Sequence, residues 1–122
     1  MFDKCYPNLM VGSVEETLEF YSRVLGFQIT DVFPPQMPFL RAVIRREDII
    51  FLLEARREAP APARPMTALT FFAPVSDVQS LYNTVRRRAV LYHDLHHTRY
   101  GSTEFAVQDP NGFILVFSQK EE

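Results

Sequence analysis

Three histidines lie close together in the second half of the chain, at positions 93, 96 and 97. Imidazole nitrogens at short spacing are typical of zinc sites, and on a helix His93 and His97 would share a face. The residues from Val90 onward favour a strand instead. Along a strand four residues span roughly 13 Å, too far for one ion, and His96 and His97 would point to opposite faces. The spacing therefore favours surface histidines near a sheet edge over a zinc site.

Four other polar side chains could take part in acid–base chemistry or in binding. Tyr6, Glu54 and Glu104 could transfer protons in an enzyme that uses no cofactor. Arg41 could hold a carboxylate or a pair of oxygens, because its planar guanidinium presents parallel N–H donors. These residues define candidates only, and no catalytic residue is assigned from the sequence.

The composition excludes several classes of function. The chain has 122 residues, 47% apolar and 23% charged, which predicts one globular domain, residues 1–122. A net charge of −2 supplies no basic field for nucleic acid. No apolar run is long enough to span a membrane, and Met1 to Lys4 do not resemble the start of a signal peptide. A single cysteine, Cys5, cannot form an internal disulfide, so a cytoplasmic location is expected.

Two segments have the pattern of a capped amphipathic helix. Ser13 stands three residues before Glu16, the spacing of a capping box, and apolar side chains recur behind it as far as Gly26. Ser76 or Asp77 begins a second helix of the same kind. Extended segments are predicted at residues 6–11, 27–33, 39–45, 49–54, 67–73, 90–95, 103–108 and 113–118.

The two halves repeat one another at an offset of 64 residues. This shift places Ser13 on Asp77 and the apolar residues of 49–53 on those of 113–117. It also places the turn at 45–48 on the Asp-Pro-Asn-Gly turn at 109–112. The sequence therefore predicts an α+β fold with two βαβββ modules, residues 4–58 and 66–119, joined by a Pro/Ala-rich linker at 59–65.

Three stretches resemble the vicinal-oxygen-chelate superfamily, which includes glyoxalase I, extradiol dioxygenases and bleomycin resistance proteins. Residues 13–27, SVEETLEFYSRVLGF, are similar to its first helix. Residues 71–82, FFAPVSDVQSLY, are similar to the start of its second module, and residues 100–117, YGSTEFAVQDPNGFILVF, to its last hairpin. The resemblance implies curved mixed sheets around a cleft.

Bleomycin resistance proteins are the nearest likeness within the superfamily. They have a proline in the first strand, as at Pro7, and the pattern G-x-E-F-A before the last turn. The corresponding stretch here, 101–106, is one residue longer between its Gly and its Glu. The tryptophans of that family's cleft are missing, because the chain contains no Trp.

The resemblance also locates the positions at which metal-dependent members carry their ligands. The first-strand ligand falls at Tyr6 and the last-strand ligand at Val116. The internal repeat then supplies Leu52 and Thr70. None of these four side chains is a good donor for a catalytic divalent ion, so neither metal nor cofactor is expected.

The strand pattern predicts an apolar and aromatic cleft. Pairing without a bulge places Phe105 opposite Val116, Arg41 opposite Leu52 and Phe39 opposite Glu54. The predicted ligand-binding residues are Tyr6, Phe39, Arg41, Leu52, Glu54, Thr70, Phe72, Tyr100, Phe105 and Val116. The same composition would also suit a buried core.

These observations favour a metal-free protein that binds a small molecule and resembles bleomycin resistance proteins. The expected ligand is planar and partly apolar, with an anionic or hydrogen-bond-accepting edge near Arg41. Two alternatives stay open: a metal-dependent lyase, isomerase or dioxygenase of the same superfamily, and a cofactorless enzyme. A homodimer is expected, formed by pairing of modules or by exchange of the first strand near Pro7.

Overall fold

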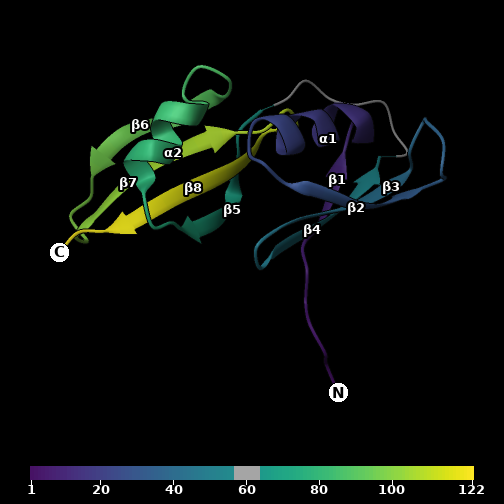
Figure 1. Ribbon diagram of the computed structural model, residues 1–122, viewed down its shortest axis with the longest axis horizontal. Coiled ribbons are helices and arrows are strands. Elements are labelled where there is room, and N and C mark those ends of the chain that lie inside the picture. The colour runs from purple at the N-terminus through teal and green to yellow at the C-terminus, as the bar shows by residue number, and fades with distance from the viewer. Residues whose placement is uncertain (57–63) are drawn as a thin grey trace. The chain divides into compact units, whose positions relative to one another are not determined.

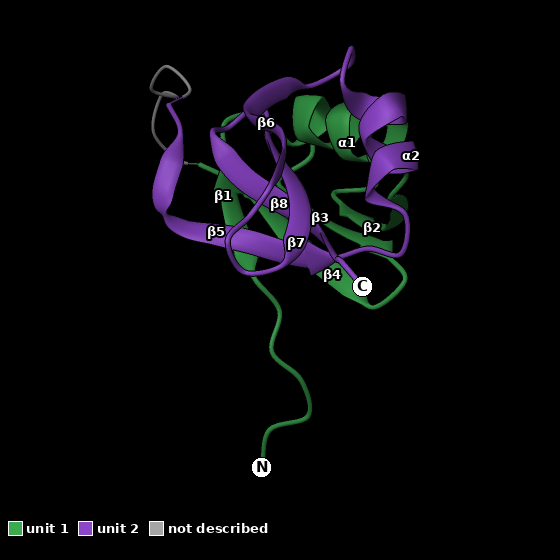
Figure 2. Ribbon diagram, turned by 90° about the vertical axis from the view of Figure 1, so that its left-hand side faces the viewer, with its two compact units in different colours: residues 1–62 green, residues 63–122 purple. Residues whose placement is uncertain are grey.

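The computed structural model describes residues 1–56 and 64–122. The chain divides into two compact units, residues 1–62 and residues 63–122 (Figure 2). Most of the linker predicted at 59–65 lies outside the described residues. Each described unit has the order strand, helix, three strands, so the predicted α+β fold with two βαβββ modules is confirmed (Figure 1).

Unit 1 is a mixed sheet of four strands with a helix on one face. The sheet order is β1-β4-β3-β2, with β1 parallel to β4 and the other neighbours antiparallel. The elements are β1 (Asn8–Val11), α1 (Val14–Arg23), β2 (Gln28–Phe33), β3 (Arg41–Arg46) and β4 (Ile49–Ala55).

Unit 2 repeats this topology with the order β5-β8-β7-β6. Here β5 runs parallel to β8, and the remaining neighbours are antiparallel. The elements are β5 (Met66–Pro74), α2 (Val78–Val85), β6 (Val90–His97), β7 (Ser102–Gln108) and β8 (Phe113–Lys120).

Both helices begin at the predicted caps. The Ser13 hydroxyl accepts the backbone N–H of Glu16 at 3.1 Å, and the Asp77 carboxylate accepts that of Ser80 at 3.0 Å. Each cap satisfies a backbone donor that the first turn of a helix would otherwise leave free. The apolar stripe of each helix then packs on its own sheet.

The core of each unit lies between helix and sheet. In unit 1, Tyr21 is fully buried and contacts the rings of Phe27 and Phe51 edge-on. In unit 2, Tyr82 and Phe105 make the corresponding edge-on contact, with ring centroids 5.3 Å apart. Edge-to-face packing of this kind adds to the stability that burial of the rings provides.

The internal repeat holds for the parallel strand pairs and changes at the hairpins. Asn8 pairs with Leu52, and the residues 64 positions later, Phe72 and Val116, also pair. The β3–β4 turn has two residues between Arg46 and Ile49, whereas the β7–β8 turn is longer and shifts the register by one. The sequence offset alone therefore predicts the sheet neighbours but not the pairing across the last hairpin.

No helix among the described residues is long and apolar enough to cross a membrane.

Candidate functional site

Side chains alternate along each strand of the unit 1 sheet, so its residues fall into two sets, one on each face. Ala42, Ile44 and Leu53 point toward α1 and are buried. Their neighbours in sequence point to the opposite side, which we term the helix-free face of unit 1. The register places on this face Asn8, Met10, Asp31, Phe33, Arg41, Val43, Leu52 and Glu54.

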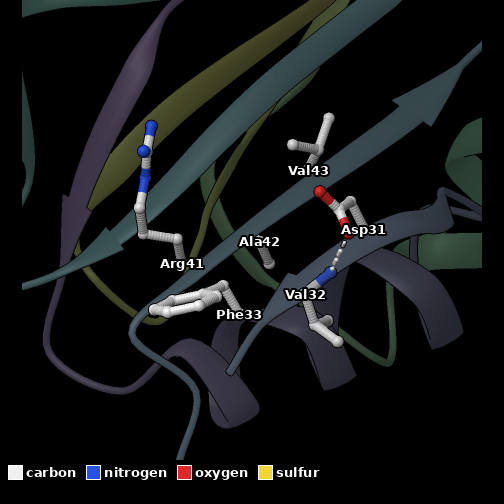
Figure 3. A pocket seen from close by; sticks show the side chains of 6 residues that line it. All are labelled: Asp31, Val32, Phe33, Arg41, Ala42 and Val43. Carbon is white, nitrogen blue, oxygen red and sulfur yellow. Dashed lines mark hydrogen bonds between the residues drawn. The ribbon is translucent and has the colours of Figure 1, made fainter. Parts of the chain in front are cut away.

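A shallow pocket of about 450 Å³ lies on β2 and β3 (Figure 3). Phe33 pairs directly with Arg41, and its side chain is 60% exposed. Arg41, Asp31 and Val43 extend to one side of the sheet, whereas Val32 extends to the other (Figure 3). The site thus brings together an exposed aromatic ring, a guanidinium and a carboxylate on an otherwise apolar surface.

The charges around Arg41 are arranged in a loose cluster. Its Nε lies 4.0 Å from Oε1 of Glu54, which also accepts from the Asn8 amide at 3.3 Å. Asp31 accepts the backbone N–H of Val32 at 3.0 Å through Oδ1. A long, exposed ion pair of this kind is weak, so the guanidinium keeps donors available for a bound oxygen.

The structure confirms that Arg41, Leu52 and Glu54 share one face of the sheet, but it corrects their partners. Arg41 pairs with Glu54, and Leu52 pairs with Val43. The observed pairing differs from the prediction by two residues because the two residues of the β3–β4 turn are Glu47 and Asp48, centred one position later than the turn predicted at 45–48. A displacement by two preserves the face of every side chain.

Phe39 does not pair with Glu54, which corrects the sequence prediction. It precedes β3, is half-buried, and its backbone N–H donates to Glu15 at 2.6 Å. Phe33 instead supplies the aromatic ring beside Arg41. Phe33 was not predicted at the site because a register irregularity between Ile29 and Asp31 interrupts the alternation along β2.

Tyr6 lies just before β1 and is 38% exposed. The neighbouring residue Pro7 accepts the backbone N–H of Leu52 at 3.0 Å, so this segment follows the edge of β4. The position of Tyr6 in the binding site stays a prediction.

In unit 2 the predicted site residues lie in three different places. Thr70, Phe72 and Val116 share the face opposite α2, with Phe72 paired to Val116 and Thr70 to Ile114. Tyr100 lies in the turn between β6 and β7 and is 85% exposed.

Phe105 is the third correction. It pairs with Phe117, not with Val116, and it is fully buried against Tyr82 on the helix side of the sheet. The residue opposite Val116 is Ala106. A shift of one residue exchanges the faces of a strand, so the longer last turn moved Phe105 from the predicted cleft into the core.

A hydrogen bond between Tyr82 and Asp94 fixes the middle of β6. The phenol donates to the Asp94 carboxylate at 2.5 Å, and the backbone N–H of Leu95 donates to the same oxygen at 2.7 Å. The Tyr82 hydrogen bond, followed by that of Leu95, lowers the pKa of Asp94, and the same bond to the carboxylate raises the pKa of Tyr82.

The comparisons with known proteins agree with this architecture. The model of the Glyoxalase/Bleomycin resistance protein/Dioxygenase superfamily matches residues 6–117. The chain belongs to this superfamily. Among curated proteins none matches it.

Several solved structures share the fold at low sequence identity. A glyoxalase/bleomycin resistance protein/dioxygenase from Alicyclobacillus acidocaldarius is 19% identical, with 98% of this chain and 92% of that chain covered and a TM-score of 0.79. A protein of unknown function from Agrobacterium tumefaciens is 16% identical, with coverage of 98% and 95% and a TM-score of 0.78. TioX from Micromonospora sp. ML1 is 16% identical, with coverage of 95% and 98% and a TM-score of 0.72.

The metal of the metal-dependent superfamily members does not fit the residues at the corresponding positions. Tyr6, Leu52, Thr70 and Val116 offer two hydroxyl groups and two hydrocarbon side chains, which is not a donor set for a catalytic divalent ion. Among the described residues, no group of three or more His, Cys, Asp or Glu side chains could hold a metal ion. We therefore derive no reaction step through a metal.

Proposed function

We propose that this superfamily member is a metal-free binding protein for a small molecule, comparable to the bleomycin resistance proteins in sequestering its ligand without chemistry. The observation that supports this proposal is the pocket on β2 and β3, where Phe33 and Arg41 pair on an apolar surface. An exposed aromatic ring beside a guanidinium with available donors is an arrangement suited to binding a flat molecule that carries hydrogen-bond acceptors.

The ligand we propose is planar and partly apolar, with an anionic or hydrogen-bond-accepting edge. A flat ring would pack against Phe33, since aromatic faces favour offset stacking. The accepting edge would face Arg41, whose fork of N–H donors matches paired oxygens. Two carboxylates, Glu54 and Asp31, stand near the one guanidinium, so the pocket has no net positive charge and the affinity for acids would depend on direct contact with Arg41.

A thermal-shift screen of aromatic acids and cationic antibiotics tests this assignment. We expect aromatic acids to raise the melting temperature of the wild type. Arg41→Ala should weaken their binding about tenfold or more, because a hydrogen bond to a charged group contributes about 1.5–3 kcal/mol.

Arg23→Ala is the matched control for Arg41→Ala. Arg23 lies on α1, is exposed and pairs only with Glu19 among the described residues, so its loss removes the same charge away from the pocket. Stabilisation by cationic drugs alone, or acid binding that survives Arg41→Ala, would contradict the proposal.

Metal analysis of protein purified without chelator separates this proposal from a metal-dependent lyase, isomerase or dioxygenase. We expect less than stoichiometric divalent metal. One tightly bound ion per chain would favour the enzyme.

A further inference from the structure

A bulge in β6 brings together two histidines that the sequence spacing separates. His93 pairs with Ala106 and His96 pairs with Glu104, so three steps along β6 match two steps along β7. Both side chains therefore lie on the face of unit 2 that also carries Val116 and Ser118, opposite α2. Their ring centroids are 3.9 Å apart with an interplanar angle of 35°.

The residue inside the bulge, Asp94, orients both imidazoles. Its carbonyl oxygen contacts Nδ1 of His93 at 3.1 Å and Nδ1 of His96 at 2.8 Å. A carbonyl can only accept, so each Nδ1 carries the proton and each neutral ring presents an unprotonated Nε2. The side chain of Asp94 is held by Tyr82, which fixes the carbonyl that both rings share.

Glu104, the strand partner of His96, is also held in place. Its Oε2 accepts the Ser102 hydroxyl at 3.0 Å and the Ser118 hydroxyl at 2.8 Å. Both serines are buried, with exposed fractions of 8% and 6%. Within the described part of the chain no hydrogen bond or ion pair reaches Oε1, so one oxygen of an oriented carboxylate stays available.

These groups form what we term the acceptor cluster: His93, His96 and Glu104. The cluster presents a negative charge and hydrogen-bond acceptors, with the hydroxyl donors of both serines already used by Glu104. No hydrogen bond joins His96 to Glu104 in the described structure, although the two residues are cross-strand partners. A donor placed between them could contact both, as cross-strand partners lie about 5 Å apart.

We propose that the acceptor cluster binds an organic cation that carries N–H donors, such as a primary ammonium or a guanidinium group. The cation would donate to Glu104 and to imidazole Nε2, and its charge would be balanced by the carboxylate. A divalent metal is the less suitable occupant, because the described residues contain no group of three side chains that could hold one. This site is formed by β6, β7 and β8 of unit 2, whereas the pocket around Arg41 is formed by residues of unit 1.

The proposal is tested by NMR titration of the full-length protein at about pH 8, where a histidine is ordinarily neutral. The probes are n-butylammonium and, as a cation of the same charge without N–H donors, tetramethylammonium. We expect n-butylammonium to shift the ring signals of His93 and His96, and tetramethylammonium to leave them unchanged. Glu104→Gln and His96→Gln should each weaken binding about tenfold, which corresponds to the loss of one charge-assisted hydrogen bond.

The chain offers a matched control for each substitution. His97 follows on the same strand but pairs with Thr103 and contacts Glu121, away from the acceptor cluster. His97→Gln and Glu121→Gln should therefore leave n-butylammonium binding unchanged.

Three outcomes would overturn the proposal. They are equal binding of tetramethylammonium, equal loss of binding in His97→Gln and His96→Gln, and binding of Zn²⁺ without any binding of n-butylammonium. Circular dichroism of each variant separates a lost contact from a lost fold, and His96→Asn, which shortens the side chain but keeps it polar, provides a second variant if His96→Gln is unstable.

Discussion

Phe72 and Phe105 are both aromatic residues of unit 2, but they lie on opposite faces of its sheet. Phe72 is 61% exposed and pairs with Val116, whereas Phe105 is completely buried between Tyr82 and Phe117. The contribution of a ring to stability depends on the surface that it removes from water and on the packing around it. The two residues should therefore respond differently to truncation.

Phe105→Ala is expected to lower the free energy of unfolding by about 3–5 kcal/mol, because it leaves a cavity in the core. Phe72→Ala should change it by no more than about 0.5 kcal/mol, since its ring is largely in solvent. Urea denaturation followed by circular dichroism measures both. Equal losses in the two variants would mean that the register of the last hairpin is wrong.

The residues around Arg41 show how much of the candidate site could be predicted from the sequence. Alternation correctly grouped Arg41, Leu52 and Glu54 on one face, because a strand has a fixed period of two. It did not identify Phe33, and it placed Phe39 in a strand that begins two residues later. Side-chain faces follow from local pattern, whereas strand partners depend on turns that the pattern does not specify.

At the scale of the elements, β6 depends on the Tyr82–Asp94 hydrogen bond. The folded-state pKa of Asp94 is depressed, so the carboxylate contributes stability above its unfolded pKa of 3.8 and loses it as pH falls through the folded value. The pKa of Tyr82 is raised, so its contribution is present below its unfolded pKa of 10.0 and is lost as pH rises through the folded value.

Asp94→Asn is therefore expected to be less stable than the wild type at neutral pH. The difference should narrow as pH falls below 3.8, because the wild-type carboxylate then becomes protonated too. Melting temperatures measured across this range provide the comparison, with Asp3→Asn in the exposed N-terminal segment as the control. A difference that does not depend on pH would show that Asp94 acts through its shape rather than its charge.

The helices were predictable because their signals are local. Ser13 and Asp77 cap them as expected, and each apolar stripe follows the helical period. The bulge at His93–His96 was not predictable, because an ideal strand spacing contains no extra residue. On an ideal strand the spacing of these histidines does not favour a shared site. The bulge turns Asp94 toward Tyr82 of α2 and thereby brings His93 and His96 together as a pair.

On the scale of the whole molecule, each sheet ends in strands with a single neighbour. These are β1 and β2 in unit 1 and β5 and β6 in unit 2. Exposed strand edges are a liability that proteins cover by pairing with another chain or by shielding them. Several large apolar side chains on these strands are exposed, including Met10, Phe33, Leu69 and Val90.

We accordingly predict a homodimer. Light scattering at micromolar concentration should give twice the chain mass of 14.2 kDa. The two modes expected from the sequence, pairing of modules and exchange of the first strand near Pro7, can be separated by removing residues 1–6. Loss of the dimer on this truncation would favour strand exchange, and a monomeric wild type would exclude both.

Gly112 affects how a mutational scan of this chain should be interpreted. Its φ is +94°, and a Cβ at this position would lie 1.8 Å from the carbonyl oxygen of Arg64. Every substitution therefore strains the backbone and displaces the start of β5, whose Met66 N–H donates to the Gly112 carbonyl at 2.7 Å. In a selection for ligand binding, position 112 would tolerate no change and would score like a contact residue. Measuring the abundance of each variant alongside its binding would separate the two kinds of position. Substitutions of Gly112 should lower abundance, whereas substitutions of Arg41 and Glu104 should lower binding at normal abundance.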